Sequence, residues 1–340
     1  MDVLTPPIPR PARQWLSVVV PVYNEEAVLP QFHQRLAAVA DGLGSEFGIE
    51  ILYVNDGSND NSIGCLVQLH ASDPRVVIID LSRNFGKEVA MSAGLDHSRG
   101  DAIILIDADL QDPPELIPAM VRAWQAGSDV VRMRRASRAN ESWLKKATAS
   151  AFYRAMGRIG EIDIPADVGD FRLLSRRAVN ALLRFPERTR FMKGLFASIG
   201  FPSAEITYDR DGRFAGDSKW NYWRLWNLAL EGITSFSVGP LKVASYVGFA
   251  TAMIAFAYGV IVIGKTMLYG EPVRGYPSLL VVVLFLGGLQ LMALGVIGEY
   301  LARMFIEVKA RPLYLVQQTL PSTQSPQAPA AAASDTCQSR

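Results

Sequence analysis

The sequence predicts an α/β protein in which a mostly parallel sheet is followed by two membrane-spanning helices. In the N-terminal part, short apolar runs alternate with amphipathic segments, and near the C-terminus there are two apolar stretches without a charged residue. A βαβαβα series implies parallel strands joined by right-handed crossovers. An uncharged stretch of about 20 residues can cross a bilayer as a helix. Together these observations predict a sheet domain tethered to a membrane.

The expected strands are short runs rich in β-branched residues, each ending at a turn signal. They are Trp15–Val20, Ile49–Val54, Val76–Ile79 and Ala102–Ile106. Between the first two, apolar residues recur with a helical period from Glu25 to Leu43, and a further helix is expected from about Lys87 to Ser98. This alternation is the basis for the predicted parallel sheet.

Polar clusters follow three of these strands: Pro21-Val-Tyr-Asn-Glu25, Asn55-Asp-Gly-Ser58 and Asp107-Ala-Asp109. The carboxyl ends of parallel strands share one edge of the sheet, so these clusters are expected to converge. Asp107 and Asp109 offer carboxylates, and Gln111 a neutral oxygen, which are ligands that a hard divalent cation prefers. A solvated turn is the alternative for this Asp-x-Asp sequence. Asp112 is expected to cap the helix that Pro113 begins.

The apolar residues near the C-terminus predict two transmembrane helices, Val243–Gly264 and Gly275–Gly298. Two buried core helices are the alternative. Lysine and arginine flank the outer ends of the pair. The first twenty residues lack a charged start followed by a long apolar core, so we do not expect a cleavable signal there. We therefore expect a multi-pass protein of the cytoplasmic membrane, with the sheet domain and both termini in the cytoplasm. The 340 residues carry a formal net charge of +1, which does not suggest a nucleic-acid partner.

These patterns divide the chain into segments. We expect a disordered start (1–14), the sheet domain (15–218), juxtamembrane amphipathic helices (219–242), the two spans (243–264 and 275–298), a cytoplasmic segment (299–318) and a disordered tail (319–340). Three tryptophans between Lys219 and Trp226 are typical of an interfacial helix, although a helix packed on the core could show the same spacing. The tail is rich in proline, alanine, serine and glutamine, which is typical of disorder.

Four motifs in order resemble those of the family 2 glycosyltransferases of GT-A fold: Val19-Val-Pro-Val-Tyr-Asn-Glu-Glu26, Val54-Asn-Asp-Gly-Ser58, Leu81-Ser-Arg-Asn-Phe-Gly-Lys87 and Asp107-Ala-Asp-Leu-Gln-Asp-Pro-Pro-Glu115. Within that family the chain is similar to the polyprenyl-phosphate sugar transferases, the group of dolichol-phosphate mannose synthase and bacterial undecaprenyl-phosphate glucosyltransferases. The absence of Gly-x-Gly-x-x-Gly after the first strand, and of a P-loop motif, argues against dinucleotide and P-loop enzymes.

The resemblance implies inverting transfer of a sugar from a nucleotide-sugar donor to a polyprenyl (undecaprenyl or dolichyl) phosphate. A UDP-linked donor is the commoner expectation, and homo-oligomers are expected in the membrane-anchored branch. The expected donor-binding residues are Pro21, Tyr23, Glu25, Asp56, Lys87, Asp107, Ala108 and Asp109. Asp107, Asp109 and Gln111 would ligate Mg²⁺ or Mn²⁺, which would neutralise charge on the leaving diphosphate. For Lys87, an ordinary surface lysine is the alternative.

Asp170 matches the position where the family places a carboxylate near the reacting centre. Asp170 and Asp109 are the expected catalytic residues. A lipid phosphate is largely ionised near neutral pH and needs positioning more than proton removal, so we expect Asp170 to orient a reactant. A buried cap, or a salt bridge to Arg172 or Arg176, is the alternative. The residues expected to bind the acceptor phosphate are Arg135, Arg138, Arg213, Ser218 and Lys219.

Two other functions stay open at this point. A processive polysaccharide synthase shares the GT-A core, but the Gln-x-x-Arg-Trp segment of those enzymes is absent here. A non-catalytic membrane scaffold could keep the fold and lose the Asp-x-Asp carboxylates, both of which are present. The sequence does not reveal which sugar is transferred.

Overall fold

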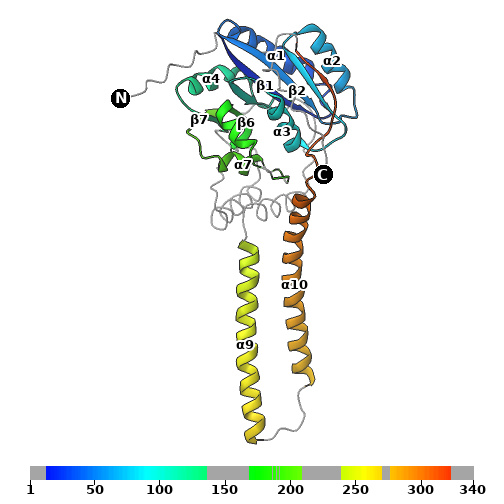
Figure 1. The fold of residues 1–340 in the computed structure, drawn as a ribbon, viewed down its shortest axis with the longest axis vertical. Helices are drawn as coiled ribbons and strands as arrows, with labels where there is room; N and C mark the ends of the chain where they lie inside the picture. The colour runs from blue at the N-terminus through cyan, green and yellow to red at the C-terminus, as the bar shows by residue number, and fades with distance from the viewer. Residues whose placement is uncertain are drawn as a thin grey trace, which may run out of the picture.

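The structure, a computed structural model, describes residues 13–135, 168–185, 187–188, 190, 192–208, 239–269 and 276–322. In this part of the chain an eight-stranded sheet carries helices on both faces, and two long helices extend from it (Figure 1). The first twelve residues and all of the expected juxtamembrane segment before residue 239 lie outside the described residues.

The strands are β1 (Gln14–Val22), β2 (Phe47–Asn55), β3 (Val76–Leu81), β4 (Ala102–Leu105), β5 (Val130–Arg135), β6 (Val168–Ser175), β7 (Ser203–Tyr208) and β8 (Val316–Leu320). They lie in the order β7-β5-β6-β4-β1-β2-β3-β8. The pairs β1–β2, β1–β4, β2–β3 and β5–β7 are parallel, and only β6 and β8 run antiparallel to their neighbours. The predicted mostly parallel sheet is therefore confirmed, with the four expected strands side by side.

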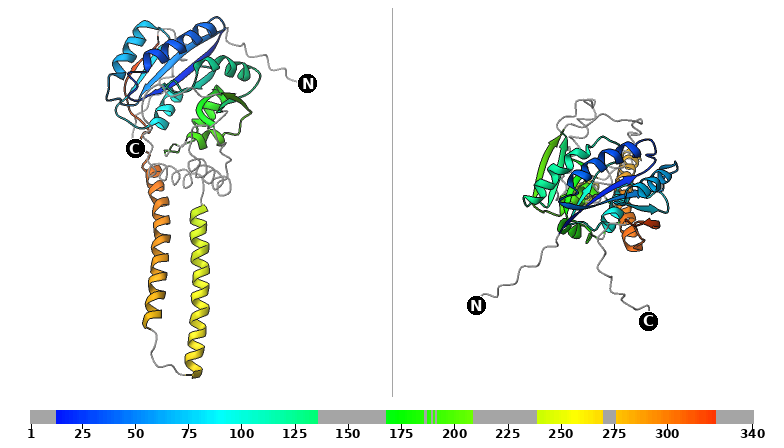
Figure 2. Two further views of the ribbon diagram at one scale, coloured as in Figure 1. Left: turned by 180° about the vertical axis from the view of Figure 1, so that it is seen from behind. Right: turned by 90° about the horizontal axis from the view of Figure 1, so that it is seen from above.

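Two helical layers cover the sheet (Figures 1 and 2). One consists of α1 (Leu29–Leu43), α2 (Ser62–Ser72) and α4 (Ile117–Gln125), which follows the short helix η1 (Pro114–Leu116); the other consists of α3 (Lys87–His97), α6 (Arg176–Leu182) and α7 (Met192–Ser198). Successive side chains of a strand point to opposite faces. Val18 therefore packs in the same cluster as Phe32 of α1, while Val19 packs in the cluster of Leu95 of α3.

Two glycines bring the start of α3 to the carboxyl edge of the sheet. A Cβ atom at Gly94 would lie 2.2 Å from Val19 Cγ1, so α3 packs on β1 at a distance that only glycine permits. Gly57 has a φ of 60°, and a Cβ there would lie 2.3 Å from the carbonyl carbon of Arg83. The turn after β2 thus fits directly against the loop that precedes α3.

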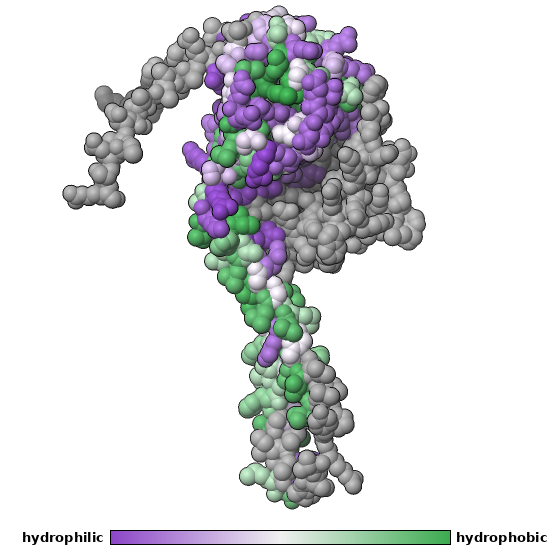
Figure 3. Space-filling view, turned by 90° about the vertical axis from the view of Figure 1, so that its right-hand side faces the viewer, coloured by the Kyte–Doolittle hydropathy of each residue, from purple (hydrophilic) through white to green (hydrophobic). Residues whose placement is uncertain are grey.

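The helices α9 (Gly239–Tyr269) and α10 (Tyr276–Lys309) form a hairpin that extends from the sheet domain (Figure 1). Its apolar side chains are exposed: Ile254 and Leu291 are each 71% accessible, and the coloured part of the hairpin in Figure 3 is mostly green, the hydrophobic end of the scale. Among the described residues one helical stretch, Phe285–Lys309, is long and apolar enough to cross a membrane, and α9 contains a shorter apolar stretch, Val243–Tyr258.

Two sequence expectations differ from the structure. The tail expected to be disordered from residue 319 is ordered to Leu320, because Thr319 and Leu320 pair with the outer edge of β3 in β8 and satisfy its backbone groups. Asp112 is not the helix cap: Pro113 occupies that position without a side-chain hydrogen bond. The buried Asp112 carboxylate instead accepts a hydrogen bond from the Tyr208 hydroxyl.

Candidate active site

Three charged side chains meet where β4 ends and β6 begins. The antiparallel register pairs Leu105 with Arg172, so two residues further along Asp107 lies opposite Asp170. Lys87, at the start of α3, places its Nζ 2.7 Å from Asp107 Oδ2 and 2.6 Å from Asp170 Oδ2. We call Lys87, Asp107 and Asp170 the charge cluster.

The charge cluster is partly shielded from water. The side chain of Lys87 is 41% exposed, and those of Asp107 and Asp170 are 21% and 16% exposed. Burial alone would lower the pKa of Lys87, but the two carboxylates outweigh it and hold the pKa above its ordinary value. Burial also opposes ionisation of Asp170, yet Lys87 and Lys193 keep its pKa well below the usual range. Lys87 and Asp170 therefore form an ionised pair.

Asp107 behaves differently from Asp170. Burial raises its pKa, and the neighbouring charge of Asp170 adds to the rise although Lys87 opposes it. The ionised form of Asp107 is thus incompletely balanced by one ammonium group. A divalent cation beside Asp107 would stabilise the carboxylate and reverse this effect.

The loop after β4 presents the second aspartate. Asp109 Oδ1 accepts a hydrogen bond from the backbone N–H of Gln111 at 3.1 Å. Leu110, between the two residues, has a φ of 60°, which is a strained value for a residue with a branched side chain. Ala108 is buried, so the chain alternates between the core and the site. Two carboxylates and an amide fit a hard divalent cation. Among the described residues no group of three His, Cys, Asp or Glu side chains could hold a metal alone, so other oxygens would have to complete its shell.

The other expected donor residues reach the same edge of the sheet. Pro21 pairs with Val54 in the β1–β2 register, and Tyr23 follows as a residue that is 43% exposed. The loops after β1 and β2 are joined by backbone-to-side-chain hydrogen bonds, among them that from Asn24 N to Ser58 Oγ at 3.0 Å. Glu25 lies in the same loop, where its carbonyl accepts from the first turn leading to α1. The contact of these residues with a nucleoside stays a prediction.

Asp56 holds the loop that carries Lys87. Its two carboxylate oxygens accept from the amides of Phe85 at 2.7 Å and Gly86 at 2.9 Å, and the side chain is buried. Burial raises the pKa of Asp56, while these two N–H groups and Arg83 oppose the rise. The expected contact of Asp56 with the nucleoside stays a prediction, but the structure gives the residue a clear role in positioning α3.

The expected acceptor residues are only partly described. Arg135 pairs through its backbone with Tyr208 at the end of β5, while Arg138, Arg213, Ser218 and Lys219 lie outside the described residues. Two other arginines of β5 form hydrogen bonds with β7: Arg132 donates to Ser203 at 2.9 Å and Arg134 to Glu205 at 3.0 Å. The arginine-rich strand is thus anchored in the sheet.

Arg172 is a buried cation beside the cluster that the sequence did not single out as functional. Its guanidinium donates to the Gly169 carbonyl at 2.7 Å and lies 3.7 Å from the centre of the Phe196 ring in α7. Burial lowers its pKa to about 10. The carboxylate of Asp170 pairs with Lys87 and not with Arg172 or Arg176, whose guanidinium donates to the Gly100 carbonyl.

Glu88, which follows Lys87 in the first turn of α3, was also missed, because an acid at a helix start is ordinary. Its Oε2 accepts from the Met192 amide at 2.8 Å. Burial raises the pKa of Glu88 from 4.5 to about 7, Asp170 adds to the rise, and the Met192 amide, Lys87 and Lys193 oppose it. The folded protein thus binds this proton more tightly than the unfolded chain. The resulting stabilisation is complete below about pH 4.5 and is lost as the pH rises to 7.

Replacing Glu88 with glutamine should therefore flatten the pH dependence of stability. The amide oxygen can still accept from Met192, but the group no longer titrates, which removes up to about 3 kcal/mol of pH-dependent free energy of unfolding. Thermal unfolding in detergent between pH 5 and pH 8 measures this. As the pH rises, the melting temperature of the wild type should fall more steeply than that of the variant. An equal dependence of the two melting temperatures on pH would contradict the raised pKa of Glu88.

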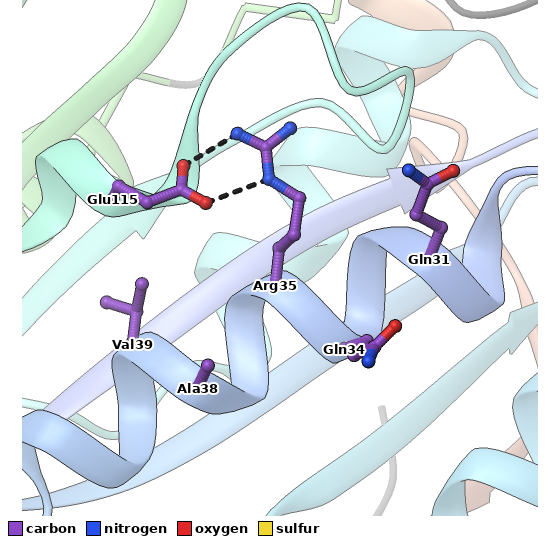
Figure 4. A pocket seen from close by; sticks show the side chains of 6 residues that line it. All are labelled: Gln31, Gln34, Arg35, Ala38, Val39 and Glu115. Carbon is purple, nitrogen blue, oxygen red and sulfur yellow. Dashed lines mark hydrogen bonds and ion pairs between the residues drawn. The ribbon is translucent and has the colours of Figure 1, made fainter.

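A shallow pocket on α1 lies outside this site (Figure 4). Gln31, Gln34, Arg35, Ala38, Val39 and Glu115 line it. Arg35 holds Glu115 by two hydrogen bonds of 2.8 Å, which fastens the segment after the Asp-x-Asp loop to α1. Both side chains are exposed enough for the pair to contribute little stability.

Comparison with known proteins agrees with the resemblance in the motifs. Residues 17–183 match the model of glycosyl transferase family 2, and residues 239–304 match that of the GtrB C-terminal hairpin. An uncharacterised glycosyltransferase of Synechocystis sp. is 53% identical over 301 residues, which cover 88% of this chain and 94% of the relative. This chain belongs to glycosyl transferase family 2.

Two further relatives of this family 2 glycosyltransferase carry more specific names. The SfII prophage-derived bactoprenol glucosyl transferase of Shigella flexneri is 48% identical over 304 residues, covering 89% of this chain and 98% of the relative. The prophage bactoprenol glucosyl transferase homologue of Escherichia coli K12 is 48% identical over 303 residues, with the same coverage of 89% and 98%. The residues that match the glycosyltransferase model include the whole charge cluster but not α7.

Proposed function

We propose that this glycosyltransferase moves a sugar from a nucleotide-sugar donor, UDP-linked, to a polyprenyl phosphate and inverts the anomeric configuration. The products are a polyprenyl-phosphate monosaccharide and a nucleoside diphosphate. Relatives named bactoprenol glucosyl transferase, at 48% identity over 89% of the chain, support the lipid acceptor. The main structural support for this active site is the Lys87 ammonium group, which contacts both Asp107 and Asp170 at the carboxyl edge of the sheet, close in sequence to Asp109.

On the donor side, Asp107, Asp109 and Gln111 would hold Mg²⁺ or Mn²⁺ together with the donor diphosphate, and the ion would supply the positive charge that the leaving group needs. Lys87 adds an ammonium group at the same place, since its Nζ already contacts Asp107. Tyr23 offers an exposed ring face to the base, as aromatic side chains do for planar ligands. These residues bind and orient the donor.

On the acceptor side, a phosphate oxygen of the lipid forms a bond to the anomeric carbon as the bond from that carbon to the diphosphate breaks. The acceptor is already ionised, so no proton has to be removed. Asp170 Oδ2 is held by Lys87, whereas its buried Oδ1 has no hydrogen-bond partner in the described part of the chain. That oxygen is suited to accept a hydroxyl of the donor sugar, which supports an orienting role for Asp170.

We place α9 and α10 in the cytoplasmic membrane as two spanning helices, with the sheet domain and both chain ends in the cytoplasm. The exposed apolar side chains of both helices support this arrangement, because a surface of that extent needs lipid or protein to cover it. The hairpin would hold the enzyme where the polyprenyl chain lies. Assembly into homo-oligomers stays a prediction.

The proposal is tested with the purified full-length protein in detergent, supplied with undecaprenyl phosphate and a set of nucleotide sugars that includes UDP-glucose. Release of the nucleoside diphosphate should require the lipid phosphate and Mg²⁺ or Mn²⁺, and should stop with EDTA. Release at the same rate without the lipid would show hydrolysis or another acceptor and would refute the proposal.

A further inference from the structure

The short helix α7, which lies beyond the residues matched by the glycosyltransferase model, brings a further cation to the charge cluster. Lys193 is one of the charges that act on Asp170 and on Glu88. Within the described part of the chain its ammonium makes no hydrogen bond or ion pair. The same helix places Phe196 against Arg172, next to Asp170.

Glu88 fixes α7 on α3. Its carboxylate accepts from the amide of Met192, the residue before Lys193, at 2.8 Å. The buried Met192 side chain also lies 3.6 Å, measured at Sδ, from Ser92 Oγ one turn further along α3. Because Glu88 directly follows Lys87, the first turn of α3 carries the lysine that contacts Asp170 and also holds the backbone next to Lys193.

The end of α10 contacts the segment that precedes α7. Glu307 Oε1 accepts from the Arg188 amide at 2.8 Å, and the Arg188 guanidinium donates to the carbonyl of Arg311. Beyond α10, the Tyr314 hydroxyl donates to Asp96 of α3 at 2.8 Å. In Figures 1 and 2, α7 lies on the side of the sheet domain that faces the hairpin. The proposed function places the lipid along the hairpin, so α7 lies on the lipid side of the sheet domain.

We propose that Lys193 binds the phosphate of the lipid acceptor and that Glu88 is the residue that positions it. This inference rests on the proposed function. Lys193 follows Met192, whose amide Glu88 holds, so α7 places it beside the charge cluster on the side that faces the hairpin. A lysine ammonium is a compact point charge that suits a phosphate monoester.

The variants Lys193→Met and Lys193→Arg test the assignment, with Lys309→Met as the control that removes an exposed ammonium stacked on Phe305 at the end of α10. Initial rates are measured while undecaprenyl phosphate and the nucleotide sugar are varied in turn. Lys193→Met should raise the KM for the lipid about 10- to 100-fold, as expected for a lost charge-assisted hydrogen bond, and leave the KM for the donor unchanged. Lys193→Arg should recover most of the loss, and Lys309→Met should match the wild type.

The positioning role of Glu88 gives a second set of results. Glu88→Ala should raise the KM for the lipid, while Glu88→Gln should not, because its amide oxygen still accepts from Met192. The double variant Glu88→Ala/Lys193→Met should be no worse than Lys193→Met alone, since both changes act through the same ammonium. Additive losses would show that Glu88 acts only on stability and would overturn its positioning role.

Direct binding of undecaprenyl phosphate to the detergent-solubilised protein, followed by tryptophan fluorescence, separates this inference from the proposed function. If the wild type binds the lipid phosphate and Lys193→Met binds it at least 10-fold more weakly, Lys193 is an acceptor ligand even if the sugar donor is misassigned. Equal binding by both, or a raised donor KM, would overturn the assignment of Lys193. No binding by the wild type would refute both proposals.

Discussion

Replacing Asp109 with alanine should abolish sugar transfer, with a loss of at least about 10³-fold, and leave the protein folded. Asp109 contributes a carboxylate to the proposed diphosphate and metal site, and its Oδ1 accepts from the Gln111 backbone N–H at 3.1 Å. Asp109 is itself only half-buried, so removing its carboxylate deprives the leaving diphosphate of a bound cation and leaves the buried neighbours Ala108 and Leu110 in place. The transfer rate is measured across a range of Mn²⁺ concentrations for the wild type and the variant.

A binding measurement separates the loss of the site from a loss of folding. UDP with Mn²⁺ should raise the melting temperature of the wild type, as a ligand specific for the folded state does, and should not raise that of Asp109→Ala. Asp41→Ala is the matched control, because Asp41 is an exposed carboxylate on α1 that pairs with Arg75. Full transfer activity in Asp109→Ala would remove Asp109 from the proposed metal site.

Replacing Lys87 with methionine should lower the transfer rate about 100- to 1000-fold, because the change removes a cation from the leaving diphosphate and leaves two carboxylates facing each other. Lys87 is the first of the charges that depress the pKa of Asp170 and that oppose the raised pKa of Asp107. Without its ammonium the pKa of both carboxylates rises. The acid limb of the pH–rate profile should therefore move to higher pH by at least about one unit.

The pH–rate profile distinguishes an ionic role of Lys87 from a loss of stability. A variant that is only less stable loses activity without a shift of the acid limb of the profile. Lys87→Arg should restore part of the rate and most of the acid limb, since a guanidinium can still bridge the two carboxylates. Lys309→Met, which removes an exposed lysine far along the chain, should retain the wild-type profile. An unshifted acid limb in Lys87→Met would contradict the ionic role assigned to Lys87.

The centre of the sheet could be predicted from the sequence because its signals are local. β2 is buried along all nine residues and is largely apolar, and β1 and β3 extend two residues beyond the expected ends at Val20 and Ile79. The convergence of Asp107 with the loops after β1 and β2 followed from the shared edge of parallel strands. β8 gave no such signal, since the polar sequence from Val316 to Leu320 becomes a strand only through pairing with β3.

The contacts that shape the site could not be predicted in the same way, because they depend on long-range register. Asp170 meets Asp107 only because β6 runs antiparallel to β4, a pairing across tens of residues that periodicity does not reveal. Asp56 was expected to face the nucleoside, yet both its oxygens accept from a loop about 30 positions away. Glu88 contacts Met192 across 104 positions, and α7 is too short for a helical period to stand out.

The chemical structure of the lipid product distinguishes inverting transfer of one sugar to a polyprenyl phosphate from other reactions of this enzyme. The full-length protein in detergent is supplied with undecaprenyl phosphate, Mn²⁺ and whichever nucleotide sugar it turns over, and the lipid fraction is analysed by mass spectrometry and NMR. We predict one sugar per lipid, joined through a phosphodiester to the anomeric carbon with a configuration opposite to that of the donor. A lipid carrying several sugars, a retained configuration or free sugar without a lipid product would contradict the account.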